Sequence, residues 1–278
     1  MAETLPSRPV LLTGASGALG RILAQALADR GWDMRLTDLL PFPGPLPQRA
    51  IFNRADLGKT GAMQRLAEGC GTILHFGGAS VDRPFAEMLA PNITGLYHVY
   101  EAARQESARM VFASSNHSIG FHERTTILDS DCSFRPDSFY GLSKAYGELM
   151  GRLYWDKHGV ENVNIRIGSC FPEPADARML ATWLSAEDLV RLTVRATLAA
   201  VTGHAVVWGA SANSAMTWWR GDQRGRIGWA PEDSADPFTA AKGGQVSTSP
   251  VTEHYQGGVY CLNGYSRPGF APVDPLGD

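Results

Sequence analysis

The sequence predicts an α/β protein in which helices cover both faces of a parallel β-sheet. Short apolar runs with the length of strands alternate with segments whose apolar residues recur at helical spacing. A glycine-rich segment separates the first such strand from the first helix. The chain has 278 residues, of which 44% are hydrophobic and 19% charged, and this is enough for one large α/β domain or for a main domain with a small appendage.

Seven strands are expected along the chain. Val10–Thr13 is a short apolar run typical of a buried strand, and apolar residues alternate with others from Val163 to Ile167. Strands that alternate with helices imply a parallel sheet, and right-handed crossovers then give the doubly wound Rossmann arrangement. In chain order the expected strands are Val10–Thr13, Met34–Thr37, Ala50–Asn53, Thr72–Phe76, Arg109–Ala113, Val163–Ile167 and Val206–Trp208.

Helices are expected between these strands. Apolar residues from Leu19 to Leu27 recur at helical spacing, and Gly31 follows as a C-terminal stop. Ser185, with Asp188 three residues on, resembles a capping box that opens a helix through Leu198. Two further helices are expected at Asn92–Arg104 and Tyr140–His158.

Charge and cysteine usage exclude several classes of protein. The net charge of −3 argues against a nucleic-acid or anionic-membrane partner, since both select for basic surfaces. No stretch approaches the roughly 18–20 apolar residues that span a bilayer, and the polar segment Met1–Ser7 lacks an apolar signal core. The cysteines form no C-x-x-C pair, so we expect no metal site, no disulfide and a cytoplasmic location with reduced thiols.

A candidate dinucleotide site follows the first strand. In the segment Thr13-Gly14-Ala15-Ser16-Gly17-Ala18-Leu19-Gly20, glycines can supply the tight turn, the close backbone approach and the helix–sheet contact that a pyrophosphate at a helix N-terminus needs. An acid, Asp38, follows about 20 residues later at the end of the second strand. Its carboxylate can accept both ribose hydroxyls and repels a 2′-phosphate, which favours NAD over NADP. The alternatives are an ordinary glycine turn and a loop cap.

Two later segments extend this site. Asp56 follows the third strand, where such folds often hold the adenine amino group, although a solvated turn residue is an equal alternative. Gly77 and Gly78 follow the fourth strand and let the backbone approach a ligand. His75 is interpreted as a packed core histidine rather than a ligand.

Beyond Gly209 the regular patterning fades while glycine, serine and tryptophan become more frequent. We expect residues 1–167 to form the NAD-binding Rossmann core. Residues 168–278 are expected to add the remaining sheet elements and a small C-terminal substrate-capping region, all within one continuous domain. Trp183, Trp218 and Trp219 are expected to pack in the core or lid rather than contact a ligand.

A catalytic constellation is expected at the start of the helix Tyr140–His158. Tyr140 and Lys144 lie one turn apart, so their side chains share a face. A nearby ammonium and the positive nicotinamide ring favour the phenolate, which is a competent general base for an alcohol. Ser114 and Ser115 end the fifth strand, where a serine hydroxyl can hold the substrate oxygen against the tyrosine.

These motifs together resemble the extended short-chain dehydrogenases and sugar-nucleotide epimerases. The resemblance implies that Ser115, Tyr140 and Lys144 form the catalytic triad and that Lys144 also binds the nicotinamide ribose. Asn92 matches an asparagine that the family keeps near the active site, although a helix cap explains it equally well. The expected cofactor contacts are Gly14, Ser16, Gly17, Ala18, Leu19, Gly20, Asp38, Asp56, Leu57, Phe76, Gly77, Gly78, Asn92, Tyr140, Lys144 and Ile167.

Finer matches resemble the uronate dehydrogenases. They are Phe112-Ala-Ser-Ser-Asn-His117, Tyr140-Gly-Leu-Ser-Lys144, Ile165-Arg-Ile-Gly-Ser-Cys-Phe-Pro-Glu-Pro174 and Arg178-Met-Leu-Ala-Thr-Trp-Leu-Ser185, with Cys170 where a small residue such as serine is expected. The resemblance covers essentially the whole chain. It implies NAD-dependent oxidation of the C1 hydroxyl of cyclic hexuronates, D-glucuronate and D-galacturonate, to the aldarolactone.

The resemblance also implies a substrate pocket. Arg178 is the best candidate for the uronate carboxylate, because a guanidinium can form two parallel hydrogen bonds with it. The alternative is a surface ion pair with Asp176 or Glu173. His117 could instead be a packed loop histidine. The expected substrate contacts are Ser80, Ser115, Asn116, His117, Tyr140, Ser169 and Arg178.

Other functions remain open at this stage. A sugar-nucleotide epimerase or dehydratase has the same fold but needs a sizeable C-terminal region for the nucleotide diphosphate, and few basic residues follow Gly209. Dehydratases carry an acid pair where this chain has Asn116-His117. A non-enzymatic NAD sensor generally lacks the tyrosine–lysine pair. We expect a small sugar acid as substrate, and a homo-oligomer that binds neither nucleic acid nor membrane.

Overall fold

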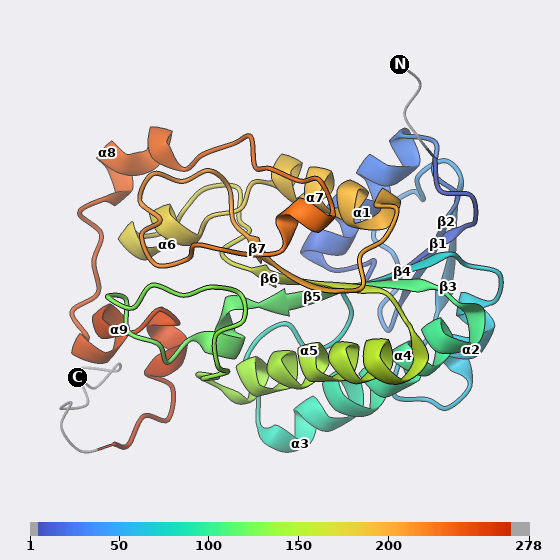
Figure 1. The fold of residues 1–278 in the computed structure, drawn as a ribbon, viewed down its shortest axis with the longest axis horizontal. Helices are drawn as coiled ribbons and strands as arrows, with labels where there is room; N and C mark the ends of the chain where they lie inside the picture. Colours follow the sequence, from blue (N-terminus) through green and yellow to red (C-terminus); the bar gives the residue numbers. More distant parts are fainter. Residues whose placement is uncertain (1–4, 268–278) are drawn as a thin grey trace.

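A computed structural model describes residues 5–267 and places seven parallel strands in the order β3-β2-β1-β4-β5-β6-β7. The expected Rossmann arrangement is confirmed (Figure 1). The strands are β1 (Val10–Thr13), β2 (Met34–Asp38), β3 (Ala50–Arg54), β4 (Thr72–His75), β5 (Arg109–Ser115), β6 (Asn162–Ile167) and β7 (His204–Gly209). Strand order reverses between β1 and β4, so the crevice at their carboxyl ends is where ligands bind in such sheets.

Helices cover both faces of the sheet. The α-helices are α1 (Ala18–Asp29), α2 (Ala62–Ala67), α3 (Phe85–Met88), α4 (Gly95–Glu106), α5 (Phe139–His158), α6 (Ala177–Thr182), α7 (Ala186–Leu198), α8 (Thr239–Lys242) and α9 (Pro250–His254). In Figure 1, α1 and α7 lie above the sheet and α2, α4 and α5 below it. None of the helices formed by residues 5–267 combines the length and apolar character that a bilayer crossing needs.

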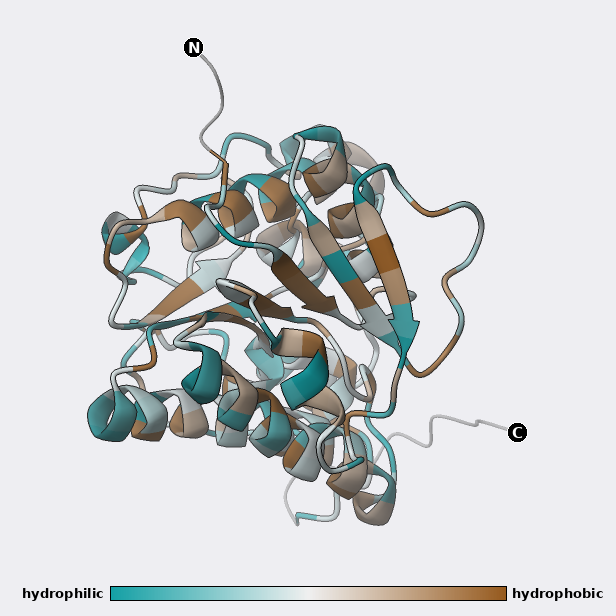
Figure 2. Ribbon diagram, turned by 90° about the vertical axis from the view of Figure 1, so that its right-hand side faces the viewer, coloured by the Kyte–Doolittle hydropathy of each residue, from teal (hydrophilic) through white to brown (hydrophobic). Residues whose placement is uncertain are grey.

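Each face of the sheet has its own apolar core. One cluster packs Leu23 and Leu27 of α1 and Leu192 of α7 against the strands, and the other packs Val99 of α4 and Tyr154 of α5 on the opposite face. Figure 2 shows apolar segments concentrated along the strands between the two helical layers. Apolar burial on both faces holds the carboxyl ends of the strands in place as a rigid platform.

The predicted tryptophan packing is confirmed. Trp183, Trp218 and Trp219 are all buried, and the ring of Trp219 stacks on Trp208 of β7 with centroids 4.9 Å apart. His75 is also a core residue, as expected, and its Nδ1 lies 2.7 Å from the Thr13 hydroxyl. Burial lowers the pKa of His75 to about 3, so this histidine stays neutral.

Local structure differs from expectation in several helices: α6, α8 and α9 form where no helix was expected, and two further differences have a clear local cause. The helix expected to begin at Asn92 is preceded by α3 and by a π-helical turn, Leu89–Thr94. Pro91 lies inside that turn and has no N–H to donate, which disfavours regular α-helical bonding there. The six-residue α2 was not expected, because its apolar pattern is too short to show a helical period.

The capping box predicted at α7 forms only in part. Ser185 Oγ accepts from the Asp188 N–H at 2.8 Å, as expected. The return bond is not made, because the Ser185 N–H donates to Ser211 instead. The Asp188 carboxylate accepts from the N–H groups of Glu232 and Asp233, so it ties the C-terminal segment to α7.

Candidate active site

A cavity of about 850 Å³ follows the carboxyl ends of the strands from the loop after β1 to the segment around α6. Its walls bring together most of the residues predicted to bind cofactor or substrate. Those that line it are Gly14, Ser16, Gly17, Ala18, Leu19, Gly20, Asp38, Asp56, Leu57, Phe76, Gly77, Gly78, Ser80, Ser115, His117, Tyr140, Lys144, Ile167, Ser169 and Arg178. Asn92 and Asn116 do not line the cavity. Asn92 contacts the wall residue Ala79, and Asn116 contacts the wall residue Arg178.

The glycine-rich turn forms a cradle that a larger residue would fill. Gly14 has a φ of 72°, and an added Cβ would overlap the carbonyl group of Phe76. A Cβ on Gly20 would overlap the carbonyl oxygen of Gly14. The N-cap of α1, Gly17, makes no side-chain cap hydrogen bond and the first turn carries no acid, so no negative side chain of that turn would repel an anion at its backbone N–H groups. These features fit the pyrophosphate of a dinucleotide.

Asp38 lies at the end of β2 with its carboxylate fixed. Oδ2 accepts from the Ser16 N–H and Oδ1 from the Leu40 N–H, each at 3.0 Å. Asp56 closes its own turn by accepting from the Gly58 N–H at 2.9 Å, and it also lines the cavity. A carboxylate accepts several hydrogen bonds, so both acids keep capacity for a ligand.

Asn92 joins the loop after β4 to helix α5. Its Oδ1 accepts from the Ala79 N–H at 2.7 Å, and its Nδ2 donates to the Ala79 carbonyl and to Ser143 Oγ. A Cβ on Gly78 would lie 2.7 Å from Asn92 Oδ1, so glycine is required there. The structure therefore places Asn92 as a support for the cavity wall near Ser80.

Ser115, Tyr140 and Lys144 converge on one point of the cavity. The Ser115 hydroxyl lies close enough to the Tyr140 hydroxyl to favour its ionised form. The Lys144 Nζ lies 5.4 Å from the centre of the Tyr140 ring. Ser138 caps α5 by accepting from the Gly141 N–H at 3.0 Å, which fixes the turn that carries Tyr140. β5 supplies the serine, and α5 supplies the tyrosine and lysine.

Burial acts on both titratable groups of this trio. It raises the pKa of Tyr140, and the Ser115 hydrogen bond works in the opposite direction. It lowers the pKa of Lys144 to about 8, although Nζ donates to the Ala113 carbonyl oxygen at 2.8 Å. Perturbed groups that meet in a cleft are typical of a catalytic site.

Arg178 lies half-buried at the far end of the cavity. Its Nε donates to the Gln256 carbonyl oxygen at 2.6 Å. When the Asn116 amide is oriented to satisfy both of its groups, its oxygen accepts from Arg178 Nη2 at 2.6 Å and its nitrogen donates to the Ile167 carbonyl at 3.1 Å. Within residues 5–267 Arg178 forms no ion pair, and Asp176 instead caps α6 by accepting from the Met179 N–H. A half-buried guanidinium that lines a cavity is suited to an anionic ligand.

His117 lines the cavity between these two ends, and sequence reasoning missed the residues that hold it. Its Nδ1 lies 2.7 Å from Asp137 Oδ2, and its ring stacks on Tyr260 with centroids 3.8 Å apart. The Asp137 carboxylate fills the space where a Cβ on Gly120 or Gly257 would lie. Asp137 and Tyr260 are distant from His117 in the sequence, and no motif marks either of them.

Cys170 lines the cavity beside Ser169, whose hydroxyl lies 2.9 Å from that of Thr182. Burial raises the pKa of the Cys170 thiol to about 12. A thiol at neutral pH is a weak nucleophile, since the thiolate is the reactive form. The predicted inert character of Cys170 is therefore consistent with its surroundings.

Comparisons with known proteins give the family. A family model described as NAD dependent epimerase/dehydratase family matches residues 10–186. The uronate dehydrogenase of Pseudomonas syringae pv. tomato is 44% identical over 93% of this chain and 95% of its own length, and that of Agrobacterium fabrum is 46% identical over 82% and 86%. The structure of a mutant uronate dehydrogenase from Agrobacterium tumefaciens, complexed with NAD, matches with a TM-score of 0.86 and 41% identity over 93% of this chain and 97% of that one. This chain belongs to the NAD dependent epimerase/dehydratase family and, within it, to the uronate dehydrogenases.

Proposed function

We propose that this protein catalyses the NAD-dependent oxidation of the C1 hydroxyl of cyclic hexuronates, D-glucuronate and D-galacturonate, to the aldarolactone. One observation carries the proposal. A single cavity holds a serine and a tyrosine that interact through their hydroxyls beside a lysine, and at its far end a half-buried arginine without a carboxylate partner among residues 5–267. The first group suits an alcohol and the second suits an acid.

The cofactor end of the cavity has the shape and polarity for NAD. The open N-terminus of α1 would hold the pyrophosphate, and Asp38 would accept the hydroxyls of the adenosine ribose. Lys144 would donate to the nicotinamide ribose. Bound NAD would supply the acceptor for the hydride that leaves C1.

Residues of the chain itself would accept the proton of the C1 hydroxyl. Ser115 holds the C1 hydroxyl oxygen, and Tyr140 accepts its proton as a phenolate. Burial disfavours that phenolate, so the Lys144 ammonium and the Ser115 hydrogen bond must stabilise it. Arg178 binds the carboxylate at C5 and so orients the ring with C1 toward Tyr140. Because the ring oxygen stays bonded throughout, the product is the lactone.

A spectrophotometric screen tests this function. The purified protein is given NAD with glucuronate, galacturonate, and the corresponding neutral sugars. NADH should form with both uronates and only very slowly with glucose or galactose. No NADH with either uronate, or equal rates with neutral sugars, contradicts the proposal.

We also propose that the protein is a homo-oligomer that associates through α5. Phe139, Leu142, Leu149 and Leu153 lie on one face of this helix and are each about half exposed. A second copy offers the same stripe, which a two-fold axis would bring into register. Light scattering should show that Leu149→Glu lowers the oligomeric state, whereas Arg195→Glu, at an exposed position of α7 on the other face of the sheet, leaves it unchanged.

Two further assignments belong with this function. We propose that residues 1–167 and 168–278 fold as one domain, because β7 pairs along its length with β6. We propose a cytoplasmic location, because all four cysteines are free thiols, as is usual for proteins in a reducing compartment.

A further inference from the structure

A buried carboxylate occupies the catalytic face of α5 without touching the cavity. Glu148 lies one turn beyond Lys144 and two turns beyond Tyr140, so the three side chains share one side of the helix. The side chain of Glu148 is 2% exposed. Charged groups are almost never buried to this extent unless they are paired, so its partners indicate its role.

The first partner of Glu148 is a buried arginine on β6. Arg166 Nε donates to Glu148 Oε1 at 3.0 Å, and Nη2 donates to Oε2 at 2.9 Å. The Arg166 guanidinium also lies over the rings of Trp208 and Phe134, at 5.3 Å and 5.5 Å from their centroids. Two hydrogen bonds in parallel and two aromatic faces allow this carboxylate one position.

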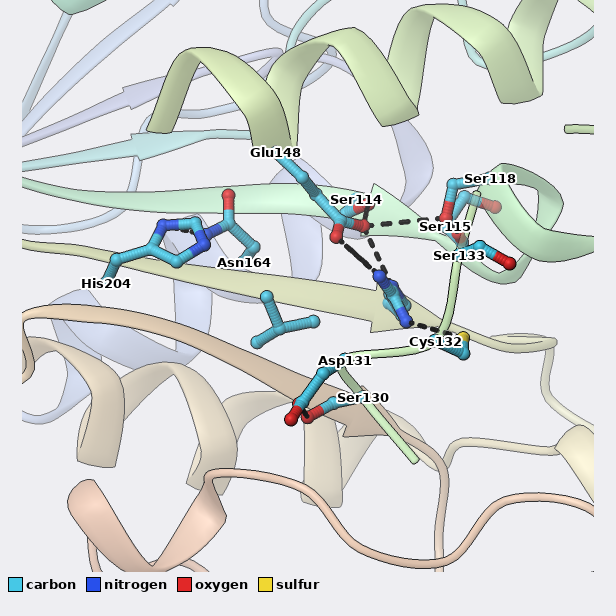
Figure 3. A network of polar contacts seen from close by, with 12 residues as sticks. Ser114, Ser115, Ser118, Ser130, Asp131, Cys132, Ser133, Glu148, Asn164 and His204 are labelled. Atoms are coloured by element: carbon cyan, nitrogen blue, oxygen red, sulfur yellow. Dashed lines mark hydrogen bonds and ion pairs between the residues drawn. The ribbon is translucent and has the colours of Figure 1, made fainter. Parts of the chain in front are cut away.

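The remaining partners lead to Ser115. Ser114 Oγ donates to Glu148 Oε1 at 2.5 Å, and Ser114 is the neighbour of Ser115 on β5. Ser118 Oγ donates to the Ser115 carbonyl oxygen at 2.8 Å and lies 3.5 Å from Glu148 Oε1. Figure 3 shows Glu148 descending from α5 toward Ser114, with Ser115 and Ser118 beyond it and Cys132 on the far side. Glu148 therefore contacts residues on both sides of Ser115 in the chain, Ser114 before it and Ser118 after it.

We propose that Glu148 is a positioning residue that keeps the Ser115 hydroxyl within hydrogen-bond reach of Tyr140. The helix that carries Tyr140 and Lys144 is joined by this carboxylate to the strand end that carries Ser115. Arg166 fixes the carboxylate and touches no reacting group. A role in geometry explains the pair better than a role in stability, because well-packed apolar residues stabilise a core as well as a buried ion pair does. The inference rests on the proposed function, in which Ser115 and Tyr140 act on substrate.

Ser114→Ala tests the proposal without breaking the ion pair. Glu148→Gln is less suitable, since it leaves Arg166 buried without its carboxylate and can prevent folding. Loss of the Ser114 hydroxyl should lower kcat about threefold or more, because small displacements of reacting groups slow catalysis strongly. The KM values for NAD and glucuronate should stay within about twofold, since neither binding end is touched.

The pH dependence of kcat gives a second readout that a purely structural role would not move. The hydrogen bond from Ser115 favours the Tyr140 phenolate, so a displaced Ser115 should shift the acidic limb of the profile upward by about half a pH unit or more. Cys132→Ala is the matched control. It removes a contact at the other end of the network, 3.6 Å from Arg166 Nη1, and should leave kcat and the acidic limb as in wild type.

The outcomes separate the two proposals. If the wild type is active and Ser114→Ala has the same kcat and the same acidic limb of the pH profile, the positioning role is overturned and the proposed function stands. A loss of kcat in Cys132→Ala equal to that in Ser114→Ala also overturns it, because general destabilisation would then explain both. A wild type that forms no NADH from uronates removes the proposed function and the positioning role with it.

Discussion

The Lys144 ammonium donates a hydrogen bond to the Ala113 carbonyl oxygen at 2.8 Å, so the lysine of α5 is anchored to the strand that ends in Ser115. This single bond leaves a buried charge with no carboxylate beside it among residues 5–267. Burial accordingly lowers the pKa of Lys144 from its usual 10.5 to about 8. The lysine of the proposed catalytic trio therefore destabilises the folded state.

Lys144→Met should abolish turnover and raise the melting temperature at pH 7. Between about pH 8 and 10.5 the unfolded chain binds a proton that the folded chain does not, so this group's contribution to stability rises with pH across that window. The difference in unfolding free energy between wild type and Lys144→Met should therefore shrink from pH 7 to pH 10. Denaturant unfolding at several pH values measures it, and a constant difference contradicts the assigned burial cost.

Tyr140→Phe should abolish NADH formation and leave NAD binding nearly unchanged. The substitution removes the proton acceptor but leaves the glycine cradle and Asp38 in place. Quenching of tryptophan fluorescence by NAD measures binding, and the absorbance of NADH measures turnover. If the variant keeps a tenth of wild-type turnover, another residue takes the proton.

The protein should prefer NAD over NADP by at least tenfold in kcat/KM, which corresponds to about 1.4 kcal/mol. The Asp38 carboxylate is fixed at the end of β2 by the N–H groups of Ser16 and Leu40, so it cannot turn away from a 2′-phosphate. Asp38→Ser should reduce this preference, mainly by raising kcat/KM with NADP. Equal kcat/KM with both cofactors in the wild type would mean that the charge of Asp38 does not discriminate between NAD and NADP.

Arg178→Ala should lower kcat/KM for glucuronate by about a hundredfold or more, equivalent to about 2.7 kcal/mol. The guanidinium is half-buried and held by Gln256 and Asn116, so its loss would leave the uronate carboxylate without its proposed partner. Slow turnover of neutral glucose should change little and serves as the control. If Arg178→Ala has wild-type kinetics with uronates, another residue binds the uronate carboxylate.

The first product should be the ring lactone. A direct route to the open diacid through a covalent adduct needs an activated cysteine, and burial holds the pKa of Cys170 near 12. NMR in the first minutes, at neutral or mildly acidic pH, should show a 1,5-lactone before any diacid. Cys170→Ala should retain most activity. Diacid from the start, together with an inactive Cys170→Ala, would establish the covalent route instead.

Sequence reasoning located the parts of the site that depend on spacing within one element. The glycine cradle, Asp38 at a strand end and the pair Tyr140 and Lys144 follow from local patterns, and the structure brings them into one cavity. Asp137 and Tyr260 were missed because each acts on His117 from a distant segment, one of them in the region where patterning fades. Long-range contacts of this kind leave no period in the sequence.

Helix boundaries show the same limit. The π-helical turn Leu89–Thr94 places Asn92 under the loop after β4, and Pro91 marks only that regular helix is disfavoured there. At α7, the N-cap bond of Ser185 follows from local sequence. The replacement of the return bond by Ser211 does not, because it depends on a segment that arrives after β7.

The backbone of residues 256–258, which contacts Arg178, belongs to a different segment from the proposed catalytic residues. The Gln256 carbonyl binds its Nε, and a Cβ on Gly258 would lie 2.8 Å from its Cδ, so the backbone of the C-terminal segment shapes the carboxylate-binding end. The groups proposed to transfer the proton lie on β5 and α5, which are not part of that segment. Selection or engineering can therefore change which acid group is accepted by varying residues 256–258 around Arg178, while the residues of β5 and α5 stay the same.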